Sequence, residues 1–181
     1  GSKQDFLQKE VNKLKESKKK IVILFLASNP KCKYRDENGD LKEKQKLDLD
    51  KEAREIKEAI TKSLNRDSID FQTRWATRVQ DLFQAINETK PTIIHFSGHG
   101  TPNGELVFQD NSDNPKKVSN EAIAEMIAAS SNEIRMIVFN NCFSSVQAEM
   151  IVDKVEATIG MNTTIGDDSA IKFASQLYSA I

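Results

Sequence analysis

The sequence predicts an α/β fold in which a mostly parallel central sheet is covered by helices on both faces. Apolar runs of strand length stand at 21–27, 92–97 and 136–139, and the first has no polar alternation, which is typical of a central strand buried on both sides. Segments with apolar residues at helical spacing separate these runs. Strands and helices that alternate in this way favour a parallel sheet between two helical layers.

The pattern of apolar residues places the strands along the chain. We expect strands at 21–27, 68–73, 92–97, 105–109, 136–141 and 157–161. The 68–73 segment alternates polar and apolar residues, so it is predicted to be an edge strand with one wetter face. Asn38-Gly39 can close a hairpin within the polar segment 31–48, and Asn103-Gly104 can form a turn before 105–109.

Helices are predicted where apolar residues recur every three or four positions. Their buried faces are expected to hold Leu49, Ala53, Ile56, Ile60 and Leu64; Val79, Leu82, Phe83 and Ile86; Ile123, Met126 and Ile127; and Ile171, Ala174, Leu177, Tyr178 and Ile181. The helix starts are predicted from capping boxes at Thr77–Gln80 and Ser144–Gln147, a cap at Ser119, and a cap at Asp167 or Asp168.

Composition limits the class of protein. With 181 residues the chain suits one domain, and its net charge of −1 argues against binding nucleic acid by neutralising phosphates. No apolar run approaches the length of a membrane span and no signal peptide is visible, so we expect a cytoplasmic protein without a membrane partner. The two cysteines, Cys32 and Cys142, indicate a reducing compartment rather than a disulfide framework.

A histidine and a cysteine follow two of the predicted strands. His99 stands between Gly98 and Gly100, and Cys142 stands just before a predicted helix start. Chemistry in an open α/β sheet collects at the carboxyl ends of the strands, so these residues are predicted to be the base and the nucleophile of a cysteine peptidase. A helix N-terminus favours the thiolate. The alternatives are that Cys142 packs as a small apolar residue and that His99 is a turn histidine bonded to backbone.

The flanking glycines extend this predicted site. They indicate either a positive φ or the close approach of another backbone, such as a substrate chain. The backbone N–H groups of Gly100 and Cys142 are predicted to form an oxyanion hole.

Metal and nucleotide sites have less support in the sequence. His95 is predicted to be a core histidine with a polar neighbour, and a zinc site of His95, His99 and Cys142 is the weaker alternative. The first strand ends in Ser28-Asn29-Pro30 rather than a glycine-rich loop, so a flavodoxin-like nucleotide domain has little support. We expect neither a metal nor a cofactor.

Two motifs resemble those of a known family. His95-Phe-Ser-Gly-His-Gly100 and Asn140-Asn-Cys-Phe-Ser144 resemble the catalytic motifs of CHAT domains, caspase-like peptidases often found with tetratricopeptide repeats. Other segments resemble family landmarks in the expected order: Leu24–Pro30, Glu52–Ile56, Trp75–Thr77, Ile159–Met161 and Ile165–Asp167. The resemblance covers residues 20–181.

The resemblance implies a caspase-like three-layer α/β/α sandwich that hydrolyses peptide bonds without a metal. It maps the catalytic histidine onto His99 and the nucleophile onto Cys142, with the substrate bound as an added strand. Ser97, Asn140 and Asp167 are predicted to bind substrate. Asp167 resembles an acidic position that favours Arg or Lys before the cut, and its alternative is a helix cap.

The resemblance also bears on domain organisation and partners. Residues 1–19 are predicted to be a Gly-Ser tag remnant and a basic helical linker, and residues 20–181 a CHAT domain truncated at its C-terminus or excised from a larger protein. A protein or peptide substrate and a controlling sensor or repeat domain are the expected partners, in bacterial antiviral defence or signalling. No nucleic acid is expected to bind this domain directly, and a homo-oligomer is left open. The alternative function is a catalytically idle caspase-like module used for assembly.

Overall fold

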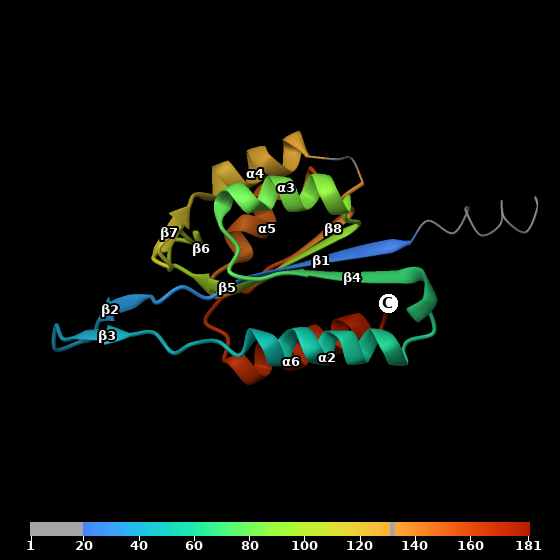
Figure 1. Ribbon diagram of the computed structural model, residues 1–181. Helices are drawn as coiled ribbons and strands as arrows, with labels where there is room; N and C mark the ends of the chain where they lie inside the picture. The colour runs from blue at the N-terminus through green and yellow to red at the C-terminus, as the bar shows by residue number, and fades with distance from the viewer. Residues whose placement is uncertain (1–19, 131–132) are drawn as a thin grey trace, which may run out of the picture.

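The computed structural model describes residues 20–130 and 133–181, so the predicted basic helix and tag remnant lie outside the described residues. The elements, labelled as in Figure 1, are β1 (Ile21–Ser28), β2 (Lys33–Arg35), β3 (Leu41–Glu43), α2 (Leu49–Lys62), η1 (Arg66–Ser68), β4 (Ile69–Arg74), α3 (Val79–Thr89), β5 (Ile93–Gly100), β6 (Leu106–Gln109), β7 (Pro115–Val118), α4 (Asn120–Ala129), β8 (Met136–Asn140), α5 (Ser145–Ile151), β9 (Ala157–Ile159) and α6 (Asp167–Ser179).

The central sheet is mostly parallel, as predicted. Strands β4, β1, β5, β8 and β9 lie side by side in that order, and all of them run parallel. Strand β4 lies at an edge, as its alternating pattern predicts. Strands β6 and β7 extend the sheet antiparallel from the end of β5, where His99 pairs with Val107. Strand β7 was not predicted, because Pro115-Lys-Lys presents no apolar alternation.

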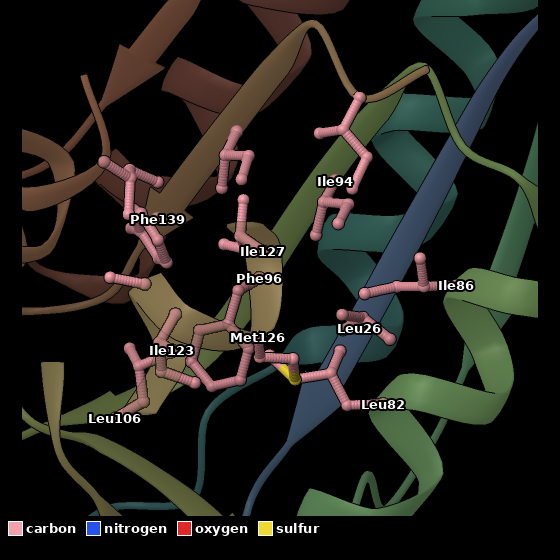
Figure 2. Close-up of a cluster of buried hydrophobic side chains, with 14 of the residues drawn as sticks. Leu26, Leu82, Ile86, Ile94, Phe96, Leu106, Ile123, Met126, Ile127 and Phe139 are labelled. Atoms are coloured by element: carbon pink, nitrogen blue, oxygen red, sulfur yellow. The ribbon is translucent and has the colours of Figure 1, made fainter. Parts of the chain in front are cut away.

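Helices cover both faces of the sheet, which confirms the predicted layers and is compatible with a caspase-like sandwich. Helices α3, α4 and α5 lie on one face, and α2 and α6 lie on the other (Figure 1). Alternation along β1 sends Leu24 and Leu26 into the first core and Phe25 into the second. Figure 2 shows the first core, where Phe96 and Met126 lie among aliphatic side chains.

The same alternation explains where the polar residues of β5 go. Ile94 and Phe96 enter the core under α3–α5. His95 and Ser97 point to the opposite face, where both contact Glu52 of α2. Strand β5 therefore presents polar side chains to the α2–α6 layer although the whole strand is buried.

The predicted hairpin forms within 31–48. Strands β2 and β3 pair antiparallel, and Gly39 has a φ of +83°, which glycine adopts without strain. The Asp36 carboxylate accepts hydrogen bonds from the N–H groups of Asn38 and Asp40 across the turn. The hairpin projects away from the sheet (Figure 1).

Three predicted helix caps are wrong. Helix α3 begins after Arg78, whose N–H donates to the Asp81 carboxylate, while the Thr77 hydroxyl donates back to the carbonyl of Arg74. A carboxylate makes a stronger charge-assisted bond than the Gln80 amide, so the box shifts by one residue. Helix α6 begins after Gly166, and both predicted caps, Asp167 and Asp168, lie inside its first turn.

The third wrong cap is the one before α5. Ser144 occupies the N-cap position but makes no capping hydrogen bond. Its hydroxyl instead contacts the carbonyls of Phe139 and Asn141 and accepts from the N–H of Met161. The side chain is fully buried, so it serves the turn before the helix rather than the helix itself.

Two predicted core residues are exposed. Leu64 is 97% exposed because α2 ends at Lys62, before the stripe reaches it. Phe83 is 45% exposed on the outer side of α3, whose buried residues are Leu82, Ala85, Ile86 and Thr89. Over residues 20–130 and 133–181, no helix is both long and apolar enough to cross a bilayer.

Candidate active site

The register of β5 and β8 brings His99 and Cys142 to neighbouring positions. Ser97 pairs with Asn140 in the parallel ladder, and His99 and Cys142 each follow two residues later. Side chains two residues apart on a strand share a face. Ser97 and Asn140 both face α2, so His99, which is still within β5, continues on that side, while Cys142 lies two residues beyond the end of β8.

Gly100 and Cys142 approach each other through their backbones. A methyl group at Gly100 would overlap the carbonyl oxygen of Cys142 and lie 2.7 Å from the side-chain nitrogen of Asn141. Gly98 is similarly tight, since its added methyl would lie 2.6 Å from the carbonyl oxygen of Ser28. The close approach that the glycines predicted therefore involves the protein's own backbone, and neither glycine has a positive φ.

The turn that carries Cys142 is held in an unusual conformation. Phe143 has a φ of +57°, in the left-handed region that non-glycine residues adopt infrequently. Its N–H donates to the carbonyl of Thr163, and the buried hydroxyl of Ser144 braces the same turn. This bend ends β8 at Asn140, leaves Cys142 half-buried and starts α5 at Ser145.

The Cys142 thiol faces the segment that leads into α6. Its Sγ lies 4.0 Å from the carbonyl oxygen of Ile165, a long hydrogen bond. On the histidine side, Nε2 of His99 is buried and has no hydrogen-bond partner among the described residues. Among the described residues, the Cys142 thiol is therefore not a hydrogen-bond partner of His99 Nε2.

The environment of His99 keeps its imidazole neutral. Burial, and next the positive charge of Lys44, lower the pKa of His99 from 6.5 to about 4. The Lys44 ammonium lies 3.4 Å from the carbonyl oxygen of Gly100, at the base of the β2–β3 hairpin. At neutral pH the His99 imidazole is therefore neutral, and the lowered pKa makes it a weaker base than an ordinary histidine.

The second cysteine lies in a different setting. Cys32 is buried, and that burial raises the pKa of its thiol despite the opposing charge of Lys44. A thiol with a raised pKa carries little of the reactive thiolate. Cys142 is thus the more accessible cysteine of the pair.

A buried carboxylate beneath the site was not predicted to have a role. Glu52 of α2 is 1% exposed and accepts hydrogen bonds from His95 Nε2 at 2.9 Å, Ser97 Oγ at 2.5 Å and Asn140 Nδ2 at 2.6 Å. Burial would raise the pKa of Glu52, but the hydrogen bonds and charge of His95, with Ser97 and Asn140, hold that pKa below its ordinary value. The sequence does contain a sign of this role, because Glu52 is a charged residue within the apolar stripe of α2, between Leu49 and Ile56.

Ser97 and Asn140, which the resemblance predicts to bind substrate, are both buried and bonded within the protein. They are 2% and 3% exposed, and both donate to Glu52. Asn140 Nδ2 also reaches the carbonyl of Ala170 at 3.2 Å. The Ser97 hydroxyl and the Asn140 amide nitrogen are therefore turned toward the α2–α6 layer.

His95 is a core histidine with polar partners, as predicted. Besides Glu52, it contacts the hydroxyl of Tyr178 through Nδ1 at 3.0 Å. No group of three or more His, Cys, Asp or Glu side chains suited to a metal occurs in the part of the chain that the structure describes.

Asp167 lies between the two helices of one layer. Its Oδ2 accepts the N–H of Asp48, the N-cap residue of α2, at 2.9 Å, and its side chain is partly buried. The next residue, Asp168, pairs instead with Lys51. Asp167 therefore joins the start of α6 to the start of α2, close in sequence to Ile165, which contacts the Cys142 thiol.

The pKa of His99 gives a direct prediction. Lys44→Gln is expected to raise the pKa of His99 above about 4. It removes the positive charge that helps to lower this pKa, while the burial of the imidazole remains. Side-chain NMR during a pH titration can follow this, since the chain has only two histidines. Lys46→Gln, an exposed lysine nearby, serves as the control. Titration of His99 near 6.5 in the wild type would contradict the burial account.

The same shift makes folding sensitive to acid. Between about 4 and 6.5 the unfolded chain binds a proton at His99 that the folded chain rejects. This contribution to the free energy of unfolding is therefore fully present above about 6.5 and is lost as the pH falls through about 4.

One family model matches nearly the whole chain. The CHAT domain model matches residues 2–181. A protein from Gillisia limnaea named "Probable protease" is 22% identical over 179 residues, covering 98% of this chain and 30% of that protein. The chain thus spans less than a third of that relative's length.

A comparison of folds adds no argument about function. A solved structure from Vibrio cholerae, named a "putative 3-deoxy-D-manno-octulosonate 8-phosphate phosphatase", is 10% identical over 93% of this chain and 90% of that one, with a TM-score of 0.26. The family match, which spans nearly the whole chain, is decisive: the chain belongs to the CHAT domain family.

Proposed function

We propose that this CHAT domain is a cysteine endopeptidase with His99 as its base and Cys142 as its nucleophile. One observation carries the proposal: the β5–β8 register sets these residues at adjoining ends of two parallel strands. The family match and the relative named as a probable protease support the same class of reaction.

The chemistry follows from the groups at the site. Neutral His99 takes the proton of the Cys142 thiol, and the thiolate attacks the scissile carbonyl carbon. The backbone N–H groups of Gly100 and Cys142 stabilise the resulting oxyanion. As the C–N bond breaks, protonated His99 gives its proton to the leaving amine. Water, deprotonated by His99, then hydrolyses the thioester and restores the thiol.

The fixed backbone geometry supports the oxyanion hole in particular. Gly100 and Cys142 are in van der Waals contact through their backbones, and the Gly100 carbonyl is bonded by Lys44. Donors fixed before reaction lose little energy in reorganisation. The positive charge of Lys44 at this edge also favours the anionic intermediate.

A preference for Arg or Lys before the cut belongs to the same proposal. Asp167 offers a carboxylate on the segment that passes Cys142, and Oδ1 is not used in its bond to Asp48. A cationic side chain of the substrate would pair with this carboxylate. The acidic first turn of α6, Asp167-Asp168, is consistent with that charge preference.

The relative is much longer than this chain, which suggests that the peptidase is part of a larger protein. Because the chain corresponds to 30% of that protein, we propose that the peptidase is a regulated effector domain of a larger protein, in the cytoplasm, in bacterial antiviral defence or signalling. A sensor or repeat domain would control it, and a homo-oligomer is one form that control can take. The unpartnered Nε2 of His99 is consistent with a domain that awaits an activating contact.

The competing proposal is an idle caspase-like module used for assembly. It predicts that Cys142 reacts with peptidyl electrophiles no faster than an ordinary exposed thiol. The position of both His99 and Cys142 after the paired residues Ser97 and Asn140 of the parallel strands β5 and β8 favours the peptidase.

The deciding experiment is cleavage of a proteome-derived peptide library, read by mass spectrometry. Wild type is expected to cut, with enrichment of Arg or Lys before the cut, and Cys142→Ala is expected to lose about 10³-fold or more of that activity. Cys32→Ala is the matched control and is expected to cut like wild type, because Cys32 is a buried thiol with a raised pKa. Cuts that persist in Cys142→Ala would contradict the proposal.

A further inference from the structure

A single buried carboxylate is bonded to both strands that carry the proposed dyad. Glu52 accepts from Ser97 of β5 and from Asn140 of β8. These two residues are cross-strand partners in the parallel ladder. Each lies two residues before a member of the dyad, so the carboxylate joins the two strands one pleat below His99 and Cys142.

The network continues into both helices beneath the sheet. Glu52 comes from α2, and His95, its third partner, contacts the Tyr178 hydroxyl of α6. An ionised carboxylate only accepts hydrogen bonds, so His95 Nε2 carries a proton toward Glu52. In the neutral imidazole, Nδ1 then accepts from the Tyr178 hydroxyl. Asn140 adds a second bond to α6 through the carbonyl of Ala170.

Charge and burial make these bonds strong and directional. The side chains of Glu52 and His95 are 2% and 0% exposed, and the 2.9 Å contact between them is a buried hydrogen bond to a carboxylate. Hydrogen bonds to a buried carboxylate are stronger than those between neutral groups, and leaving one unmade is costly. A relative shift of β5 and β8 would break one of these bonds, so the network resists that shift.

We propose that Glu52 is a positioning residue that holds His99 and Cys142 in register for reaction. The inference rests on the proposed function, in which these residues act as a dyad. Glu52 lies beneath the sheet and touches neither reacting atom, so it acts only through Ser97, Asn140 and His95. Displacing reacting groups by about 1 Å can cost about 100-fold in rate, which makes such a support consequential.

The test shortens the carboxylate without removing its charge. Glu52→Asp withdraws the oxygens by about 1.5 Å, one C–C bond, so they cannot reach all three donors at hydrogen-bond distance. Glu58→Asp is the matched control: it makes the same change on the same helix, where Glu58 is exposed and pairs only with Lys62 among the residues described. The readout is the second-order rate of Cys142 alkylation by iodoacetamide, with mass spectrometry separating Cys142 from Cys32.

Each substitution is also made in a His99→Ala background. If Glu52 only positions His99 and Cys142, its substitution slows Cys142 alkylation only when His99 is present, whereas general damage to the fold slows alkylation in both backgrounds. With His99 present, Glu52→Asp is expected to slow alkylation about tenfold while Glu58→Asp leaves it unchanged. Without His99 the proton acceptor is gone, so Glu52→Asp is expected to change the rate less than about twofold. Urea unfolding verifies that each variant is folded under the assay conditions.

Two results would overturn the inference and leave the dyad intact. One is a Glu52→Asp rate equal to wild type when His99→Ala is slow. The other is an equal loss in both backgrounds, which indicates general damage to the fold. If His99→Ala alone reacts like wild type, the dyad itself is wrong and the inference falls with it.

A second variant keeps the test decisive if Glu52→Asp does not fold. Asn140→Ala removes the bond to β8 and leaves Glu52 bonded to His95 and Ser97. Asn140→Ala is expected to slow Cys142 alkylation only when His99 is present, and to lower the free energy of unfolding less than Glu52→Asp does. Equal rates for Asn140→Ala and wild type would overturn the inference.

Discussion

Gly100→Ala is expected to slow peptide cleavage strongly and to lower the free energy of unfolding. The added methyl would overlap the carbonyl oxygen of Cys142, and backbone atoms cannot swing aside as a side chain can. Overpacking of this kind typically costs about 1–3 kcal/mol or more. The ends of β5 and β8 must separate to make room, so His99 and Cys142 would also separate, at a cost of about 100-fold or more in kcat/KM.

Gly166→Ala provides the matched control for this change. A methyl at Gly166 meets no atom within 4 Å, and its φ of −70° suits alanine. Urea unfolding and peptide cleavage on both variants make the comparison. If Gly100→Ala were as stable and as active as Gly166→Ala, the close backbone approach at the site would be refuted.

Tyr178→Ala is expected to lower the free energy of unfolding by about 3–5 kcal/mol, as for other large aromatic residues truncated in a core. Tyr178 is fully buried against the α2 side of the sheet, and its hydroxyl contacts His95 at 3.0 Å. Burial, with the charge of Glu52, raises the pKa of Tyr178, so the phenol stays protonated and able to donate.

Two further variants separate packing from hydrogen bonding. Tyr178→Phe keeps the ring and loses the hydrogen bond to His95. Its free energy of unfolding, measured by urea unfolding, is expected to fall by about 1–2 kcal/mol. Phe83→Ala truncates an aromatic ring that is 45% exposed and is expected to cost much less than Tyr178→Ala. A similar loss in Tyr178→Ala and Phe83→Ala would show that α6 does not hold the core together.

Apolar runs and turn residues were sufficient to predict the sheet and its layers. The runs at 21–27 and 136–139 form β1 and β8, since a continuous apolar segment has no stable place except between two layers. The side chain of Ser119 caps α4 as predicted, because a serine before an apolar stripe has no competing partner there. Asn38-Gly39 forms its turn for a similarly local reason.

Features that depend on contacts between distant segments were not predicted. Ser144 has the sequence of a helix cap, yet Met161 and two carbonyls of the preceding turn take its hydroxyl. Strand β7 forms because β6 supplies a partner edge, which no pattern in Pro115–Val118 reveals. Contacts with distant segments, rather than local sequence propensity, therefore determine the role of Ser144 and the formation of β7.

The strand-end positions of His99 and Cys142 could be predicted from the sequence, but the buried network beside them could not. His99 and Cys142 stand at strand ends, which a linear pattern reveals. Ser97 and Asn140 look equally available in sequence, but the pleat turns them inward to Glu52, which is 45 and 88 residues away along the chain. Their burial follows from register, and register becomes visible only once strands are paired.

The β2–β3 hairpin offers a place where the chain can be lengthened. Its strand residues are exposed and pair with each other, and a methyl at Gly39 would meet nothing within 4 Å. Extending an exposed loop costs little, since closure entropy rises only slowly with loop length. A peptide tag or a reporter domain inserted at Asn38-Gly39 would therefore leave the sandwich assembled. Lys44 follows directly after β3 and contacts the carbonyl of Gly100, so a label attached at Lys44, unlike one at the hairpin tip, would report on what approaches this end of β5.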